Sequence, residues 1–221
     1  MEINKKITLH NFTSLSGKKN EFIVVHYVGA VSSAKNNADY YYKNRLSASA
    51  HYFVDEREIW QSVEDCHSAW HCGGGLQGAD GHKYHGICKN SNSIGIEMCV
   101  KKTESGKWYF EEKTVSNTVK LIKYLMEKYS IPVSNVIRHF DVTGKLCPEP
   151  YISEAVWNDF KKRIIKKEVK EYTSANDIVW ELADRGIVSD KEGMLKEMEN
   201  HPGGRLYWLG RKAVQYIREN V

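Results

Sequence analysis

The sequence predicts an α/β protein in which helices flank a mixed central β-sheet, followed by a small three-helix domain. Two observations support this fold class. Over residues 1–165, short apolar runs rich in β-branched and aromatic residues alternate with stretches of helical periodicity. After a charged segment at 166–172, residues 173–221 show only helical patterns. A chain of 221 residues is long enough for one mid-sized domain with a small appendage.

Several strands are expected in the first domain. FIVVHYV at 22–28 is typical of a buried strand. SAHYFVD and EIWQSV, which Glu56 and Arg57 separate, predict a hairpin. SIGIEMCV at 93–100 and the short segment 136–140 predict two further strands. The glycine-, histidine- and asparagine-rich residues 66–92 lack periodicity and predict a long loop, which in a compact domain is usually functional or mobile.

Three helices are expected between these strands or after them. A polar helix is predicted near 34–46, and an apolar stripe from Val115 to Tyr129 predicts a second helix that Pro132 ends. The third begins at a Ser153 cap. Its predicted buried residues are Val156, Phe160 and Ile164.

The C-terminal segment predicts three short helices. Ser174 with Asp177, and Ser189 with Glu192, are capping-box patterns that each precede an apolar stripe. Gly186 ends the first helix, and residues 201–204 end the second. The stripe of the third helix consists of Leu206, Leu209, Ala213 and Ile217.

Charge and composition exclude some classes of function. A net charge of +4 suits an anionic cell wall, or reflects a few surface lysines, but is far from the clustered basic face of a nucleic-acid binder. No apolar run approaches the roughly 18–20 residues that span a bilayer, so no membrane insertion is expected. The start lacks the apolar segment of a secretory signal, and the five cysteines do not resemble a disulfide framework. We therefore expect synthesis in a reducing cytoplasm.

A metal site is suggested by His26, which lies within an apolar strand. A lone histidine there is more often a buried neutral side chain with a backbone partner. However, His139 ends another predicted strand, and Cys147 lies eight residues later. Two imidazoles and one thiolate suit zinc and leave a fourth position for water. The 113 residues between His26 and His139 make spacing alone a weak signal.

Five segments in order strengthen this interpretation: the strand with His26, SAHYFV at 49–54, AWHCG at 69–73, SIGIE at 93–97, and His139 followed by KLCP at 145–148. Together they resemble the type 2 N-acetylmuramoyl-L-alanine amidases, relatives of phage lysozyme-type amidases and peptidoglycan-recognition proteins. The resemblance covers about residues 20–165 and implies their mixed-sheet fold.

The resemblance also implies roles for individual residues. His26, His139 and Cys147 would bind Zn2+, Glu97 would be the acid/base carboxylate, and Lys145 the cation that stabilises the oxyanion. Trp70 and His71 match a segment near the substrate groove, with Cys72 where the family usually has Ala. His51 matches a supporting position. The substrate would be bacterial peptidoglycan, cut between N-acetylmuramic acid and L-alanine.

Alternatives remain open from the sequence. A second, structural zinc site could use the histidines and cysteines of the long loop: His67, His71, Cys72, His82, His85 and Cys88. The chain could be a non-catalytic peptidoglycan-recognition module, although such receptors usually lack the cysteine that is present here.

A phage endolysin, which waits in the cytoplasm until the membrane is permeabilised, is favoured over a host autolysin. The C-terminal helices are expected to bind the wall through Tyr207, Trp208 and Tyr216, or else to self-associate.

Overall fold

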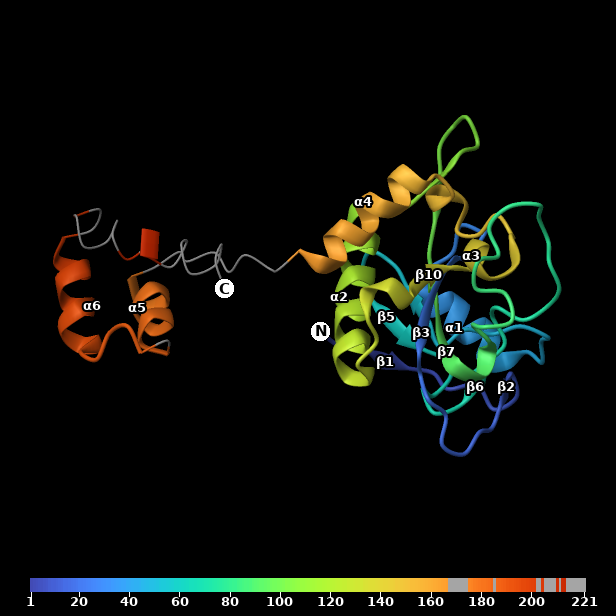
Figure 1. Cartoon of the computed structure of the whole chain (residues 1–221), viewed down its shortest axis with the longest axis horizontal. Coiled ribbons are helices and arrows are strands. Elements are labelled where there is room, and N and C mark those ends of the chain that lie inside the picture. The colour runs from blue at the N-terminus through green and yellow to red at the C-terminus, as the bar shows by residue number, and fades with distance from the viewer. Residues whose placement is uncertain (167–174, 185, 202–203, 205–209, 211, 214–221) are drawn as a thin grey trace. The chain divides into compact units, whose positions relative to one another are not determined.

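The computed structural model describes residues 1–166, 175–184, 186–201, 204, 210 and 212–213, and it divides the chain into two compact units, Met1–Lys166 and Lys167–Val221. The first unit is built on a six-stranded sheet, and helices pack on it (Figure 1). This confirms the predicted fold class of a mixed sheet flanked by helices. No helix among the described residues is long and apolar enough to cross a bilayer.

The central sheet has the strand order β1-β5-β4-β7-β3-β10. Its strands are β1 Asn4–Lys5, β3 Phe22–Tyr27, β4 Tyr52–Val54, β5 Ile59–Gln61, β7 Ser93–Met98 and β10 Val136–Arg138. Only β4 and β5 pair antiparallel, which confirms the predicted hairpin. The others pair parallel, so the carboxyl ends of β7, β3 and β10 lie at one edge of the sheet.

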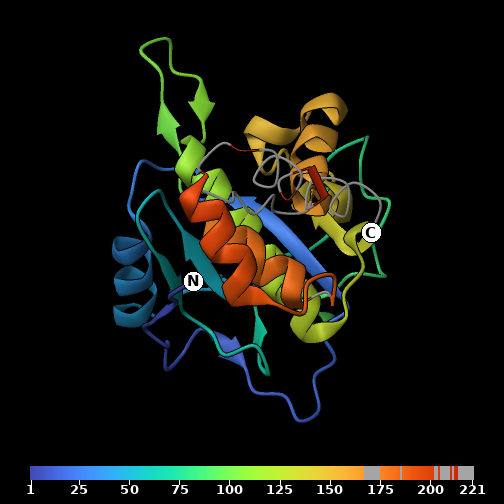
Figure 2. The ribbon, with the colours of Figure 1, turned by 90° about the vertical axis from the view of Figure 1, so that its left-hand side faces the viewer.

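Two smaller pairs of strands complete the first unit. β2 Phe12–Thr13 pairs with β6 Ser68–Ala69, which lies inside the segment that was expected to be a loop. β8 Lys101–Lys102 pairs with β9 Trp108–Tyr109, and this hairpin projects from the unit (Figures 1 and 2). Three single-turn helices, η1 Asn90–Asn92, η2 Val133–Asn135 and η3 Glu149–Tyr151, lie in the connections.

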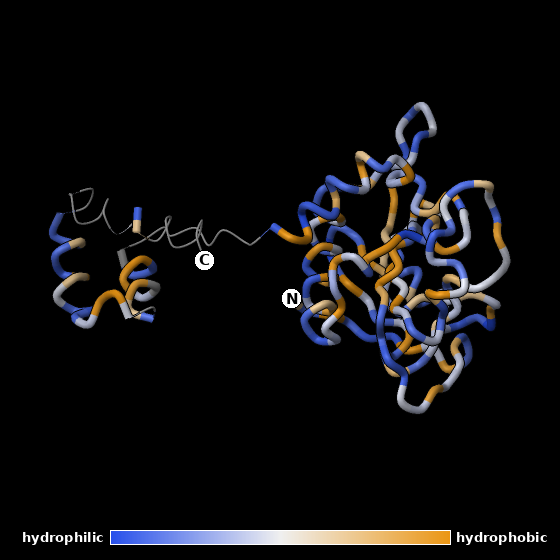
Figure 3. Tube along the Cα trace, in the orientation of Figure 1, coloured by the Kyte–Doolittle hydropathy of each residue, from blue (hydrophilic) through white to orange (hydrophobic). Residues whose placement is uncertain are grey.

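One face of the sheet forms the main apolar core. Alternate residues of β3 and β7, Ile23, Val25, Ile94 and Ile96, pack against α2 Glu112–Tyr129 and α4 Glu154–Ile165. The hydropathy colouring of Figure 3 shows apolar segments gathered along these central strands. Because side chains alternate along a strand, the intervening residues of β3 and β7 are directed to the opposite face.

That opposite face is partly apolar and partly polar. Phe22 and Val24 pack with Cys72, Cys88 and the residues Ile137 and Val142. Towards β4, the helix α1 Ala34–Lys43 covers Phe53. Where β3 and β7 end, the same face carries His26 and Glu97. The strand periodicity therefore places two titratable side chains on the face that the long 70–92 segment covers.

Two details of the first unit differ from the sequence predictions. Val156 is 42% exposed, and the buried stripe of α4 is Trp157, Phe160 and Ile164. His139 does not end a strand, because β10 stops at Arg138 and His139 begins the short helix α3 His139–Thr143. The second predicted helix agrees with the prediction, since it ends at Tyr129, shortly before Pro132, and Ser130 follows in a left-handed conformation with φ of 54°.

The second unit contains α5 Ala175–Asp184 and α6 Lys191–Asn200. Ile178, Val179, Leu182 and Met198 form its buried cluster. The N-cap of α6 is Asp190, whose side chain accepts a hydrogen bond from the Gly193 amide at 2.9 Å, rather than the predicted Ser189. The predicted third helix and Ser174 lie largely outside the described residues, as do Tyr207, Trp208 and Tyr216.

Candidate metal centre

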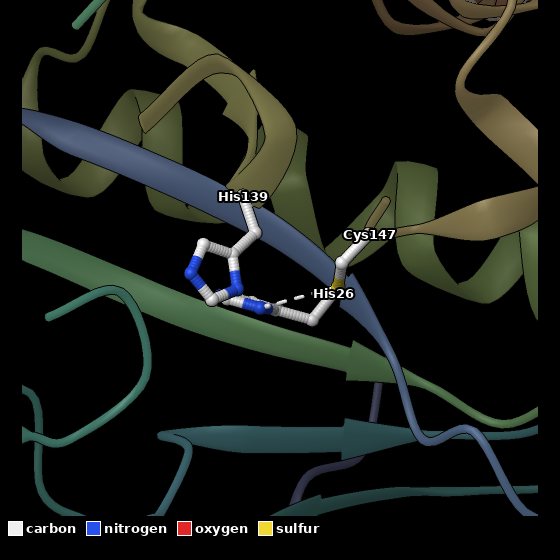
Figure 4. A group of neighbouring side chains, drawn as sticks. All are labelled: His26, His139 and Cys147. Carbon is white, nitrogen blue, oxygen red and sulfur yellow. Dashed lines mark hydrogen bonds between the residues drawn. The ribbon is translucent and has the colours of Figure 1, made fainter. Parts of the chain in front are cut away.

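His26, His139 and Cys147 come together at the carboxyl edge of the sheet (Figure 4). One potential ligand atom from each lies within 4.8 Å of the others, and all three side chains are buried. Cys147 Sγ is 3.6 Å from His26 Nδ1. The His26 and His139 ring centroids are 4.8 Å apart. The structure thus gathers the three residues that were predicted as metal ligands.

The fold explains why these distant residues meet. Val25 of β3 pairs with Arg138 of β10, so His139 emerges beside His26 at the adjacent strand end. The loop after α3 then returns to the same place, because the Phe140 amide donates to the Cys147 carbonyl at 2.8 Å. Gly144, with φ of 78°, ends α3 in the left-handed conformation that glycine favours and turns the chain back.

The spacing of these atoms fits a tetrahedral zinc site. Zinc–nitrogen distances of about 2.0–2.1 Å and a zinc–sulfur distance of about 2.3 Å place ligand atoms about 3.6 Å apart at a tetrahedral angle. His26 Nδ1 and Cys147 Sγ have this separation. Both ring nitrogens of His139 are buried without a hydrogen-bond partner in the protein. A metal ion would satisfy one of them, which is an independent indication of a ligand.

Burial controls the protonation of these groups. It lowers the pKa of His26 well below its ordinary value, with neighbouring His139 acting in the same direction. Burial also lowers the pKa of His139 to about 4. Both imidazoles are therefore neutral at pH 7 and able to bind a metal. Burial raises the pKa of the Cys147 thiol to about 12, so that a bound cation would be needed to hold it as a thiolate.

Glu97 lies beside this cluster, as register partner of His26 across β3 and β7. Its Oε2 atom is buried without a hydrogen-bond partner. Burial raises the pKa of Glu97 to about 8, and the charge of Lys145 opposes that rise. A carboxyl group with such a pKa can both accept and donate a proton near neutral pH, as general acid–base catalysis requires.

Lys145 is exposed on the loop between α3 and Cys147. Its positive charge is close enough to lower the pKa values of Glu97, His26 and His139. The side chain is therefore an exposed cation close to the His26–His139–Cys147 group, and its contact with substrate stays a prediction.

Trp70 and His71 occupy different surroundings. The Trp70 indole donates to Thr13 Oγ1 at 2.9 Å and lines a hollow of about 560 Å3 between the β2–β6 pair and the long loop. His71 instead turns inward, and its Nδ1 lies 3.1 Å from His26 Nε2. Contact of these two residues with substrate stays a prediction.

The supporting residues around His71 were not anticipated from the sequence. Asn90 Oδ1 accepts from the His71 and Cys72 amides, at 3.1 and 2.8 Å. Ser93 Oγ lies 3.2 Å from His71 Nε2. The one available signal was Gly95, since glycine within a strand often marks the close approach of another group. His51, predicted as a supporting residue, is fully buried and accepts from the Gly95 amide through Nδ1 at 3.0 Å.

No second group of potential metal ligands is found in the described part of the chain. His26, His139 and Cys147 are its only group of three potential ligands. The alternative structural zinc site in the 67–88 segment, all of which the structure describes, is therefore not supported. Cys72 and Cys88 pack instead in the apolar cluster under β3.

Comparisons with known proteins agree with this site. Residues 16–150 match the family model for N-acetylmuramoyl-L-alanine amidase. The chain is 32% identical over 153 residues to the N-acetylmuramoyl-L-alanine amidase CwlL of Bacillus licheniformis, covering 64% of this chain and 40% of CwlL. The chain thus spans less than half the length of that relative.

Solved structures give the same result. The structure of PlyL superposes with a TM-score of 0.62 at 28% identity, covering 76% of this chain and all of PlyL. A mutant endolysin from Bacillus subtilis gives a TM-score of 0.58 at 30% identity, covering 74% of this chain and 99% of the endolysin.

The fold and the site define a class of α/β proteins that bring two histidines and a cysteine together at the carboxyl edge of a mixed sheet. By its family match, which covers more than half of its length, the chain belongs to the N-acetylmuramoyl-L-alanine amidase family. This confirms the resemblance drawn from the five sequence segments.

Proposed function

We propose that this protein is a zinc amidase that hydrolyses the bond between N-acetylmuramic acid and L-alanine in bacterial peptidoglycan. The observation on which the proposal depends most is the buried His26–His139–Cys147 cluster beside the partnerless carboxyl group of Glu97. Family membership indicates the substrate class, and the names of the relatives give the bond that those proteins cleave.

Zinc held by these three residues would supply an acidified water and polarise the substrate carbonyl. Glu97 would take the proton from the attacking water and pass it to the leaving alanine nitrogen. Its pKa near 8 suits both halves of this transfer, because the same group must first accept and then donate. Lys145 would place its positive charge against the developing oxyanion, a role typically worth about 3–4 kcal/mol in the transition state.

The experiment that tests this function is product analysis of digested walls. Purified walls treated with the zinc-loaded protein should gain free amino groups on L-alanine and no new reducing sugar ends. New reducing ends would indicate a glycosidase instead. Wall binding without any release of amino groups would indicate a non-catalytic recognition module.

The second unit has a proposed role of its own. We propose that residues 173–221 attach the enzyme to the wall, in the arrangement of a phage endolysin that acts once the membrane is permeabilised. Trp180 is 54% exposed on α5, and Lys191 lies 4.0 Å above its ring. An exposed aromatic ring of this kind can stack on a sugar, which supports wall binding over a purely structural role. One alternative is that this unit serves self-association, which the truncation experiment below would reveal. The other is a host autolysin with the same chemistry, which the source of the gene would distinguish from a phage endolysin.

A further inference from the structure

The two ring nitrogens of His26 face different partners. Nδ1 lies 3.6 Å from Cys147 Sγ, on the side of the metal cluster. Nε2 lies 3.1 Å from Nδ1 of His71, on the opposite side of the ring. A neutral imidazole has one N–H and one lone pair, so only one of these nitrogens can bind a metal.

A chain of hydrogen bonds determines which nitrogen has the proton. It begins at the Lys89 carbonyl, which can only accept, and to which Ser93 Oγ donates at 2.6 Å. Because the hydroxyl proton of Ser93 is engaged in this bond, Ser93 Oγ can only accept from His71 Nε2, which lies 3.2 Å away. His71 Nδ1 is then a lone pair that accepts from His26 Nε2.

The backbone holds the His71 ring in this position. A Cβ atom at Gly95 would lie 2.5 Å from the His71 ring, so the ring rests directly on strand β7 where no side chain intervenes. The His71 amide is anchored to Asn90 Oδ1. The ring consequently meets His26 edge-on, with centroids 5.1 Å apart and an interplanar angle of 90°.

We propose that His71 is a positioning residue, which together with Ser93 fixes His26 in the Nε2–H tautomer and leaves Nδ1 to bind the metal. The proposal rests on the proposed zinc site. Histidine ligands commonly donate their second N–H to such a partner, which orients the ring and increases its basicity. In this protein the partner is a second histidine, His71, which belongs to a series of hydrogen bonds that ends at the Lys89 carbonyl.

Zinc affinity of the full-length protein, measured by competition with a chromophoric chelator, tests the proposal. His71→Phe keeps a ring over Gly95 but removes the acceptor, and should raise the zinc dissociation constant about 10- to 100-fold. His71→Gln, whose amide can accept from His26 and donate to Ser93, should recover part of that loss. His10→Phe replaces an exposed histidine and should bind zinc like the wild type.

Tautomers are read directly from long-range 1H–15N NMR spectra of the zinc-free and zinc-loaded protein. Both His26 and His71 should appear as Nε2–H forms, and Ser93→Ala should mix the tautomers of His71 and weaken zinc binding. Should His71→Phe fail to fold, Ser93→Ala decides, and unchanged tautomers with unchanged affinity would overturn the proposal. Equal zinc affinity in a folded His71→Phe would also overturn it, whereas a wild type that binds no zinc would instead contradict the proposed function.

Discussion

His26 and Glu97 are register partners in the parallel strands β3 and β7, so the imidazole and the carboxyl group lie side by side at the carboxyl edge of the sheet. On its other side Glu97 pairs with Phe53 of β4, an apolar neighbour that is fully buried. The carboxyl group thus has the metal cluster on one side and the core on the other. This position explains its raised pKa, and it would bring the carboxyl group close to a water on a zinc ion held by His26, His139 and Cys147.

Replacement of Glu97 by Gln should abolish most activity while leaving the metal in place. The amide keeps the volume of the side chain but cannot transfer a proton, so we expect a rate loss of about a hundredfold or more. Release of amino groups from purified walls and zinc content are the two measurements. Glu104→Gln, at the exposed tip of the β8–β9 hairpin, is the matched control and should retain wild-type activity. Comparable rates for the two variants would exclude Glu97 as the general base.

Replacement of Cys147 should empty the metal centre. Wild type should hold about one zinc ion per molecule, and Cys147→Ala should hold almost none, because three ligands from distant positions are all required. Cys66→Ala is the control, since Cys66 is an exposed free cysteine outside the cluster. Metal analysis after gel filtration measures both. Full zinc occupancy in Cys147→Ala would show that the ligand assignment is wrong.

Lys18 should give stability a distinctive pH dependence. Burial lowers the pKa of its ammonium group from 10.5 to about 8, although Nζ donates to the carbonyls of His67 and Ser93, both at 2.8 Å. Because the unfolded chain keeps this proton up to about pH 10.5, it binds more protons than the folded state between these values. The free energy of unfolding should therefore rise with pH in this window, and the gain should be lost as pH falls through 8.

The measurement is urea unfolding at several pH values between about 7.5 and 10. Lys18→Met should flatten the rise relative to wild type by an amount on the order of 1 kcal/mol. Lys19→Met changes the exposed neighbouring lysine and should leave the slope as it is. A slope that Lys18→Met does not change would show that this ammonium group is not responsible.

Two positions one turn apart on α4 test where the buried face of that helix ends. Phe160 is 2% exposed and packs among Tyr151 and Trp157, so Phe160→Ala should lower the free energy of unfolding by about 3–5 kcal/mol. Val156 is 42% exposed, and Val156→Ala should change it by less than about 0.5 kcal/mol. Thermal or urea unfolding of both variants measures the difference. A loss of more than about 1 kcal/mol in Val156→Ala would instead restore the predicted burial of Val156.

The sequence was sufficient for the features that depend on local pattern. The apolar runs around His26 and Glu97 predicted both strands, and family resemblance predicted which residues would meet at their ends. It was insufficient where tertiary contacts decide. The partnership of His26 with His71 depends on how the long loop returns over Gly95, which no local periodicity describes. Val156 was predicted to be buried, but Trp157, one residue later, packs into the core in its place because its apolar surface is larger.

Removal of the second unit should separate chemistry from attachment. The first unit ends at Lys166, whose carbonyl accepts from Lys123 Nζ at 2.6 Å, and its core includes the buried stripe of α4. A chain cut after about Lys167 should therefore fold, bind zinc and cleave soluble muramoyl-peptides at the wild-type rate. If residues 173–221 bind the wall, the same truncated chain should digest insoluble walls poorly, because a tethered binding module raises the effective concentration of the catalytic site at its substrate. Residues 173–221 fused to a fluorescent protein should then label the target cells. Unlabelled cells, together with a lower oligomeric mass of the truncated chain, would show that this unit serves self-association instead.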